Sequence, residues 1–320
     1  MYHIIVNPLS KSGKGKKYWE LLLPILKETD TAYNVYFTEN EGHATKIVKS
    51  IVATNEKPLS FLALGGDGTL NEVIQGIDDF ENTHIGYIPT GSSNDFARDL
   101  EMYTSPVKNL KRILSINTPT SYDLGELTIL DGKKRITDEL IAKTNPVKFL
   151  FSVSSDIGFG AAVCEKALES KIKKVLNKLG LGKLTYAGIA LSQIIHAPKA
   201  SLKITIDNEK KIDVSSFFLI GAFIHRFQGG GMMFAPAANP TDGLFDVCLA
   251  KNLTTLRTLR LLPTIFSGKH IRFPEIEIFK CKTVELETSR YLWVHTDGEV
   301  YYKAKHIRLT SLPAKLKLLW

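Results

Sequence analysis

The sequence predicts a two-domain protein: a three-layer α/β domain with a mostly parallel sheet over residues 1–122, followed by a β-rich domain over residues 123–305. The first third alternates β-branched runs with helical periods, whereas closely spaced strand-like runs dominate after about Ser121. The 320 residues also exceed the usual domain size of about 100–200. The C-terminal segment 306–320 is left open as a further part of the first domain.

Four strands and the helices between them make up the predicted α/β domain. The strand-like runs are 3–6, 33–37, 59–64 and 84–88. The helices show buried faces at helical spacing, as in Trp19, Leu22, Leu23 and Leu26. Such βαβα order implies right-handed crossovers, with ligands gathering at the carboxyl ends of the strands.

The second domain is predicted from strand-like runs separated by turn residues, at 121–130, 147–155, 201–207, 216–224, 244–250, 274–279 and 283–287. Helical periods occur at 160–179, 183–197 and 253–266. Because no long linker stands near residue 122, the domains are expected to pack closely with a cleft between them.

Bulk properties narrow the class of protein. Hydrophobic residues make up 44% of the chain and charged residues 23%, which is globular composition. The first apolar stretch ends after four residues, and no run approaches the about 20 apolar residues that span a bilayer. We therefore expect a cytoplasmic protein whose membrane contact, if any, is peripheral. The net charge of +8 favours anionic partners.

Three strand-to-helix turns have the composition of phosphate-binding loops. They contain Asn7 to Gly15, Gly65 to Asn71, and Thr90, Gly91, Asn94 and Asp95. Glycines let the backbone approach a ligand, and helix N-termini offer free N–H groups to phosphate. Neither the Walker A nor the Rossmann pattern is present. Any one loop could merely close a tight turn, but together they predict convergence on one sheet edge.

The motifs NP…SGKG, GGDGTLNEV, PTGSSNDFAR, TDGLFDV and HTDGEV occur in the order seen in the diacylglycerol kinase catalytic family. Nearly the whole chain resembles this family, above all soluble bacterial diacylglycerol kinases. It is more distantly similar to sphingosine, ceramide and NAD kinases. The resemblance implies a nucleotide-binding α/β domain, a β-sandwich domain for the lipid substrate, and ATP and Mg²⁺ as cofactors.

The resemblance also implies an ATP site lined by Asn7, Pro8, Leu9, Ser10, Lys11, Thr38, Gly65, Gly66, Asp67, Gly68, Thr69, Leu70, Asn71 and Thr90. Asp67 would engage the catalytic magnesium, with Asp95 extending the acidic network through water. Asp123 is an equally open candidate for this network or for packing. The alternative for Asp67 is a residue that only shapes the turn.

Two further acidic motifs are candidate sites by the same resemblance. Asp297 and Glu299 could supply the general base that accepts the proton of a lipid hydroxyl; sequence does not say which one acts, and an acidic hairpin tip is the alternative. A structural magnesium would be held by Asn239, Asp242 and Leu244. Thr241 stands where the family often has an acidic residue, so a metal-free β-turn is the alternative there.

The expected reaction is transfer of the γ-phosphoryl group of ATP to a lipid hydroxyl, from diacylglycerol to phosphatidic acid. Sphingoid-base or NAD kinase activity is the first alternative. A non-catalytic nucleotide- or nucleic-acid-binding protein is the second, and the acidic set argues against it. The partners are a lipid and an anionic membrane surface, which a basic amphipathic helix over 166–180 could contact unless it packs on its own domain. A homodimer is left open.

Overall fold

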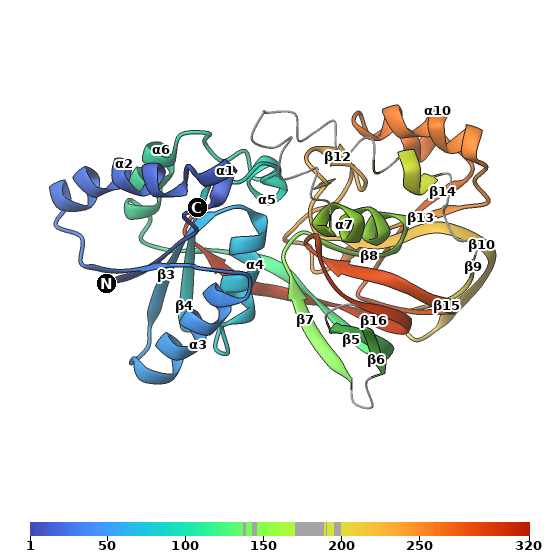
Figure 1. The fold of residues 1–320 in the computed structure, drawn as a ribbon, viewed down its shortest axis with the longest axis horizontal. Helices are drawn as coiled ribbons and strands as arrows, with labels where there is room; N and C mark the ends of the chain where they lie inside the picture. The colour runs from blue at the N-terminus through green and yellow to red at the C-terminus, as the bar shows by residue number, and fades with distance from the viewer. Residues whose placement is uncertain (137–138, 143–145, 170–188, 190, 195–199) are drawn as a thin grey trace. The chain divides into compact units, whose positions relative to one another are not determined.

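The computed structural model describes residues 1–136, 139–142, 146–169, 189, 191–194 and 200–320 (Figure 1). The chain divides into two compact units. Unit 1 comprises Met1–Leu124 and Leu312–Trp320, and unit 2 comprises Gly125–Ser311. Most of the helical segments predicted at 166–180 and 183–197 lies outside the described residues.

The sheet of unit 1 is parallel and follows the strand-like runs of the sequence. β1 (Tyr2–Val6) lies between β2 (Tyr33–Phe37) and β3 (Leu59–Gly65), and β3 pairs with β4 (Thr83–Pro89). The end of β16 (Glu299–Leu318) adds a further parallel strand, through Lys317 and Leu318 beside β4. The C-terminal segment therefore completes a sheet that the N-terminal residues begin.

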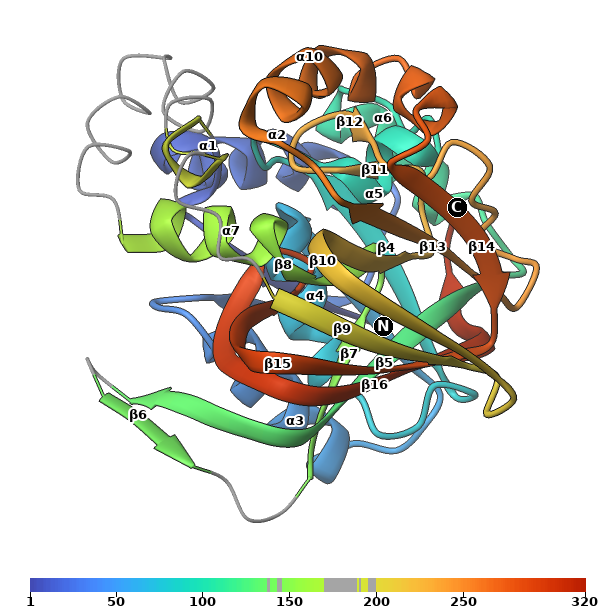
Figure 2. The same cartoon turned by 90° about the vertical axis from the view of Figure 1, so that its right-hand side faces the viewer.

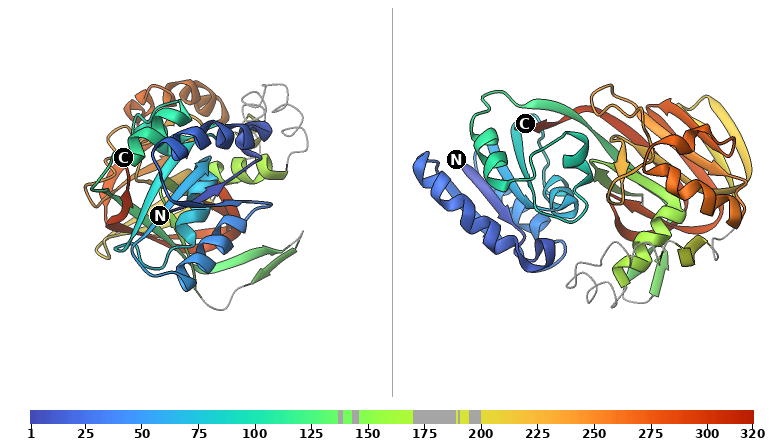
Figure 3. Two further views of the ribbon diagram at one scale, coloured as in Figure 1. Left: turned by 90° about the vertical axis from the view of Figure 1, so that its left-hand side faces the viewer. Right: turned by 90° about the horizontal axis from the view of Figure 1, so that it is seen from above.

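The helices of unit 1 are α1 (Ser10–Gly13), α2 (Gly15–Glu28), α3 (His43–Thr54), α4 (Asp67–Gln75), α5 (Asp95–Asp99) and α6 (Pro106–Leu114). Figures 1 and 3 show α2 and α6 on one side of the sheet, and α3 and α4 on the other. Alternate residues of β1, Ile4 and Val6, share a buried cluster with Trp19 and Leu22 of α2. The helical spacing of apolar residues thus identified the face of α2 that is buried.

Unit 2 is rich in strands. They are β5 (Thr120–Ile136), which starts in unit 1, β6 (Glu139–Ala142), β7 (Val147–Phe151), β8 (Ser154–Gly158), β9 (Ala200–Ile206), β10 (Lys210–Phe223), β11 (Phe227–Gln228), β12 (Met232–Met233), β13 (Phe245–Lys251), β14 (Ile276–Cys281), β15 (Thr283–Thr296) and β16. The helices are α7 (Phe159–Glu169), α10 (Thr255–Ile265) and the 3₁₀ helix η1 (Lys269–Arg272). No helix in the described part of the chain is long and apolar enough to cross a bilayer.

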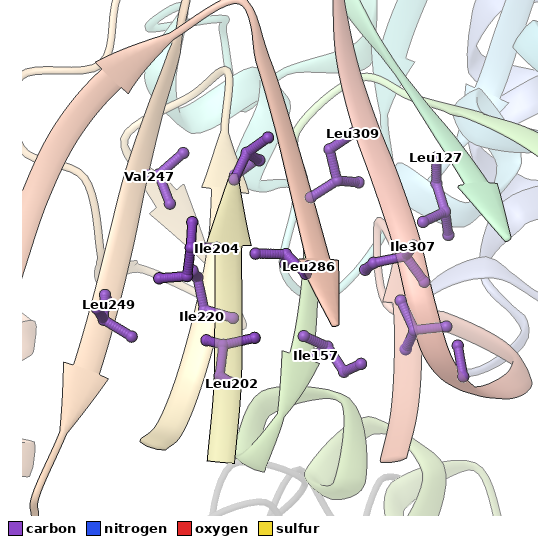
Figure 4. Close-up of a cluster of buried hydrophobic side chains, with 14 of the residues drawn as sticks. Leu127, Ile157, Leu202, Ile204, Ile220, Val247, Leu249, Leu286, Ile307 and Leu309 are labelled. Carbon is purple, nitrogen blue, oxygen red and sulfur yellow. The ribbon is translucent and has the colours of Figure 1, made fainter. Parts of the chain in front are cut away.

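Two long strands change partners midway and so fold the sheet over one core. β10 pairs with β9 in its first half and with β8 in its second, with a register shift between Val214 and Phe217. β15 likewise pairs first with β9 and then with β8, and its pairing with β16 shifts register between Glu287 and Leu292 (Figure 2). Bulges of this kind bend strands. The enclosed core contains Leu127, Ile157, Leu202, Ile204, Ile220, Val247, Leu249, Leu286, Ile307 and Leu309 (Figure 4).

Candidate functional site

The three strand-to-helix loops of unit 1 meet at the carboxyl edge of its sheet. Asn7 Nδ2 donates to Thr69 Oγ1 at 3.1 Å, which joins the first loop to the second. Ser10 Oγ and Thr90 Oγ1 lie 3.0 Å apart, which joins the first loop to the third. The main-chain N–H of Thr90 donates to the carbonyl of Gly65. The predicted convergence of the loops is therefore confirmed.

Two glycines allow the second and third loops to touch through their backbones. A methyl group on Gly91 would lie 2.5 Å from the Cα of Gly66, a separation that real side chains do not adopt. Asn94, with a φ of 50°, fixes the third loop by accepting from the N–H of Gly91 at 2.9 Å. Its amide also donates to the Gly91 carbonyl at 3.1 Å. The glycines are thus needed for close approach.

Asp67 stands at the first residue of α4, where its carboxylate links two loops. Oδ2 accepts from the main-chain N–H of Asp95 at 2.9 Å, and Oδ1 accepts from the hydroxyl of Tyr87 at 3.4 Å. Burial, followed by the negative charge of Asp67, raises the pKa of Tyr87 well above its usual value, so the hydroxyl stays a donor. Asp95 is buried, with Arg98 Nε 3.6 Å from its Oδ1.

The donor set at Asp67 fits a magnesium ion. Its side chain is only half-buried, and the N–H of Asp95 and the hydroxyl of Tyr87 that donate to its carboxylate are both neutral. A carboxylate oxygen can accept a second interaction, and Mg²⁺ takes one or two carboxylates together with phosphate oxygens and water. Asp67 could therefore hold the ion that accompanies a nucleotide, with the main chain of Asp95 keeping the carboxylate in place.

A polar pocket of about 150 Å³ opens beside these loops. Four of its lining residues, Asn7, Leu9, Thr38 and Thr69, are among the predicted nucleotide-binding residues. The rest of the lining is Glu39, Asn40, Glu41, Ala44 and Glu72, none of which was predicted. The run of polar residues after β2 could have indicated this part of the pocket, but only Thr38 of that run was predicted to bind the nucleotide.

Glu72 has a structural task in this pocket. Its two carboxylate oxygens accept from the main-chain N–H groups of Gly42 and Ala44, at 2.8 and 3.0 Å. These groups lie at the start of α3, where N–H groups lack partners within the helix. Glu72 therefore ties α4 to the N-terminus of α3 and shapes the wall of the pocket.

The remaining predicted nucleotide-binding residues are placed less directly. Leu70 is fully buried in the core, so only its main chain could meet a ligand. Asn71 is buried too and accepts from Gln75 Nε2 at 3.3 Å. Lys11 is exposed, with its ammonium 5.8 Å from the ring centre of Tyr18. Pro8 and Gly68 are half-buried within their loops.

Asp123, which sequence left open between two roles, binds backbone of the same unit. Its Oδ1 accepts from the N–H of Ala314 at 2.7 Å, and the side chain is buried. Ala314 has a φ of 52°, a strained value for a residue with a side chain. The contact therefore helps to hold the returning C-terminal segment, which favours the packing role.

In unit 2, the carboxylate of Asp297 is surrounded by donors. Oδ2 accepts from the N–H of Ser152 at 2.8 Å and from its hydroxyl at 3.0 Å. Oδ1 accepts from the N–H groups of Val153 and Ser154, at 2.8 and 3.0 Å. Four hydrogen bonds occupy most of the accepting capacity of a carboxylate. Asp297 thus fastens the β15–β16 turn to the segment between β7 and β8.

A buried hydrogen-bond network also holds the β15–β16 turn in place. His295 Nε2 lies 2.7 Å from Asp156 Oδ2, and its Nδ1 accepts from the N–H of Gly298 at 3.2 Å. Gln228 Nε2 also donates to Asp156, at 2.8 Å. Burial disfavours the imidazolium, but the carboxylates of Asp156, Asp297 and Glu299, Asp156 foremost, outweigh it and raise the pKa of His295. Because Nδ1 accepts from Gly298, the proton on Nε2 must point at Asp156.

Glu299 differs from Asp297 in its surroundings. It is half-buried and lines a small hollow of unit 2 with Phe149, Thr296 and Tyr301. The turn that presents it is rigid, because Asp297 and Gly298 both have left-handed φ values and both are hydrogen-bonded to their surroundings. Sequence patterns did not point to Asp156, Gln228 or His295, although His295 immediately precedes the TDGE motif.

The predicted structural magnesium site contains a lysine ammonium. Asp242 Oδ1 accepts from the N–H of Leu244 at 3.0 Å, and Lys280 Nζ lies 2.6 Å from Asp242 Oδ2. The same ammonium is 3.4 Å from Asp246, whose pKa is raised by burial although Lys280 acts to lower it. The carbonyl of Asn239 accepts from Asp242 N–H. A divalent ion would have to displace Lys280, so this arrangement fits the β-turn alternative better; metal at these residues stays a prediction.

Two protein-family models match the chain. Residues 1–127 match the model of the diacylglycerol kinase catalytic domain. Residues 157–320 match the YegS C-terminal NAD kinase beta sandwich-like domain. The chain therefore belongs to the diacylglycerol kinase catalytic family and is a kinase.

Individual relatives extend over nearly the whole chain. A Bacillus subtilis protein named "Putative lipid kinase YtlR" is 28% identical, covering 99% of this chain and 98% of that protein. A Mycobacterium tuberculosis protein named "Diacylglycerol kinase" is 25% identical, covering 98% of this chain and 93% of that one. A crystal structure titled as "a putative diacylglycerol kinase" from Bacillus anthracis superposes with a TM-score of 0.72 at 20% identity, covering 100% and 96%. That likeness shows the fold alone.

Proposed function

We propose that the protein transfers the γ-phosphoryl group of ATP to the hydroxyl of a lipid, with diacylglycerol as acceptor and phosphatidic acid as product. One observation carries the proposal. Three glycine-containing loops are hydrogen-bonded to one another around a half-exposed Asp67 and a polar pocket, in a chain of the diacylglycerol kinase catalytic family. Relatives along the full chain are named as diacylglycerol or lipid kinases.

Unit 1 is proposed to bind the nucleotide. The pocket lined by Asn7, Thr38 and Thr69 would take part of the ATP, and the loop N–H groups would face its phosphates. Asp67 would hold the magnesium ion, with Asp95 and Tyr87 fixing its carboxylate. When bound, the ion would offset the negative charge that develops on the phosphate oxygens during transfer.

Glu299 is proposed as the general base and Asp297 as the residue that positions it. Glu299 would accept the proton of the lipid hydroxyl as that oxygen forms a bond to the γ-phosphorus, while the bond from the γ-phosphorus to the bridging oxygen of ADP breaks. Asp297 is poorly suited to accept a proton, because its two oxygens already accept four hydrogen bonds. Those bonds instead define where the next turn residues lie.

An acceptor panel tests the proposed function. Purified protein would be incubated with γ-labelled ATP and magnesium, and with diacylglycerol, ceramide, a sphingoid base or NAD, the lipids being in mixed micelles. We expect label in phosphatidic acid and none in the Asp67→Asn variant. Label in NADP with none in any lipid would reject the lipid acceptor, and label in ceramide phosphate or sphingoid phosphate alone would reject diacylglycerol.

A further inference from the structure

The outer surface of α10 and η1 in unit 2 concentrates exposed apolar side chains. The structure describes five exposed large hydrophobic residues in unit 2, and four of them, Leu256, Leu259, Phe266 and Ile271, belong to this segment. Leu256 is 61% exposed and Phe266 58%. Isolated exposed leucines are common on protein surfaces, but a cluster of this size indicates a binding surface.

The exposed residues follow the helical period on the side of α10 that faces away from the core. Leu256, Leu259, Pro263 and Phe266 recur at spacings of three and four residues and are exposed. The opposite stripe, which includes Leu261 and Ile265, is buried against Phe223, Phe234 and other residues of the cluster. Figures 1 and 2 show α10 at the periphery of unit 2. The helix therefore has two apolar stripes, of which one has no partner among the described residues.

The charged side chains in the segment that contains α10 and η1 are all basic. Between Val247 and Pro274 the sequence contains five Lys or Arg residues and no Asp or Glu. Lys251 and Arg257 pair with Glu277 and Glu275. Arg260, Lys269 and Arg272 are exposed, and within the described part of the chain none of them forms an ion pair. Three uncompensated cations thus flank the exposed apolar stripe.

The backbone holds this surface in a fixed shape. His270, at the centre of η1, is buried and its Nε2 lies 3.0 Å from the carbonyl of Phe234. Gly268, with a φ of 67°, forms the turn between α10 and η1 and packs against Met233 and Pro236. Ile271 and its basic neighbours are therefore presented outward by anchored residues.

We propose that the outer surface of α10 and η1 docks the protein onto an anionic lipid bilayer. Apolar side chains flanked by unpaired cations match the boundary between acyl chains and acidic head groups, whereas an acidic protein partner would not require a continuous apolar stripe. The choice of a bilayer rests on the proposed lipid substrate. This surface consists of other residues than the segment 166–180, which the sequence had suggested for the same role and most of which lies outside the described residues.

Vesicle co-sedimentation of the full chain tests the proposal, using phosphatidylcholine vesicles with and without phosphatidylglycerol. The parent should bind the anionic vesicles more tightly, and less so as salt is raised. Arg260→Gln/Lys269→Gln/Arg272→Gln should weaken binding by about 10²-fold, at about fivefold for each cation removed. Leu259→Glu/Phe266→Glu should weaken it at least about tenfold, because it removes buried apolar area.

Matched controls separate this surface from general effects. Leu21→Glu alters an exposed leucine of unit 1, and Lys210→Gln/Lys211→Gln/Lys282→Gln removes three exposed cations elsewhere in unit 2. Both should bind vesicles within about twofold of the parent, once the effect of their lower net charge on long-range attraction to the vesicle has been subtracted. If the α10 variants bind as the parent does, or if the controls lose as much, the proposal is wrong.

Two further measurements distinguish the remaining outcomes. Light scattering would show whether the parent is a dimer that Leu259→Glu/Phe266→Glu converts to a monomer; that result would make the surface an interface between copies and overturn the proposal. Phosphorylation of a short-chain, water-dispersed diacylglycerol should be unaffected in the α10 variants, whereas phosphorylation of vesicle-borne diacylglycerol should fall with binding. Selective loss of vesicle binding with no lipid phosphorylated by any form would reject the proposed function while supporting the docking surface.

Discussion

At the TDGE turn, two carboxylates separated by one glycine have different surroundings. Asp297 accepts four hydrogen bonds from residues 152–154, whereas Glu299 lines a hollow of unit 2. A carboxylate whose oxygens already accept four hydrogen bonds has little accepting capacity left for a further proton. The motif alone left the two residues equivalent, and the difference arises from a segment nearly 150 residues earlier in the chain, which no local pattern reveals.

Removing the charge of Glu299 should therefore impair catalysis, whereas removing the charge of Asp297 should impair stability. Glu299→Gln is expected to lower kcat for the lipid by ~10²–10⁴-fold, with little change in melting temperature or ATP affinity. Asp297→Asn should lower stability by about 2–4 kcal/mol, because an amide nitrogen would face N–H donors. Steady-state kinetics and thermal unfolding of both variants provide the comparison. Near-parental kcat in Glu299→Gln would remove it as the base.

Asp67 is expected to be essential for turnover and unimportant for folding. Asp67→Asn should lower kcat by at least about 10²-fold, since it removes the charge proposed to hold magnesium. Tyr87→Phe is the matched control, because it removes a neutral donor from the same carboxylate at 3.4 Å. It should retain activity within about tenfold. Native circular dichroism with full activity in Asp67→Asn would exclude the residue from the mechanism.

At the level of elements, sequence patterns predicted most of unit 1. The four strand-like runs match β1 to β4 within one or two residues. Three of these strands, β1, β3 and β4, are almost wholly buried, and buried parallel strands consist of nearly continuous apolar runs. The meeting of three loops followed from the rule that ligand sites lie at the carboxyl ends of such strands. The wall of the pocket was not predictable in the same way, because Glu39, Glu41 and Glu72 are ordinary surface residues until α3 and α4 are packed together.

The close approach of the second and third loops depends on Gly91. In Gly91→Ala, the new methyl group would lie 2.5 Å from Gly66 Cα and 2.7 Å from Asn94 Oδ1, so the loops must separate. We expect ATP affinity to fall at least about tenfold, with a loss of stability of about 1–3 kcal/mol. Ser92→Ala, at an exposed neighbouring position, should change neither. Equal nucleotide affinity in the two variants, measured by calorimetry, would contradict this account.

The turn between Asn239 and Leu244 offers a test of metal against lysine. If Lys280 supplies the positive charge at Asp242 and Asp246, adding magnesium or chelator should leave the melting temperature of the parent unchanged. Lys280→Met should lose about 1 kcal/mol, a modest value because the lysine is 41% exposed. It should then be stabilised by magnesium, since a vacated pair of carboxylates can bind the ion in the folded state alone. A chelator-sensitive parent would instead support the predicted metal site.

For the molecule as a whole, the chain order of the two units has consequences that no single element shows. Unit 1 consists of Met1–Leu124 and Leu312–Trp320, with all of unit 2 inserted between them. The sequence suggested this return only as an option for 306–320, because one short apolar strand does not reveal its partner. In the structure, Leu316, Leu318 and Leu319 are buried, and the indole of Trp320 donates to the Leu100 carbonyl at 3.2 Å.

Residues 1–124 should consequently be unable to fold without the last nine residues of the chain. Without them, the N–H and C=O groups of one side of β4 lose their partner strand, and the apolar surface that covers Leu316, Leu318 and Leu319 meets water. A fragment 1–124 is expected to be aggregated or unfolded by circular dichroism.

A second fragment, in which a short Gly/Ser linker joins Leu124 to Leu312, should fold and bind ATP. Asp123 Oδ1 lies 2.7 Å from Ala314 N, so the linker spans little distance. Introducing Leu316→Asp and Leu318→Asp into this linked fragment should return it to the unfolded state. Cooperative unfolding of 1–124 alone, with the same nucleotide affinity as the linked form, would show that the returning strand is dispensable.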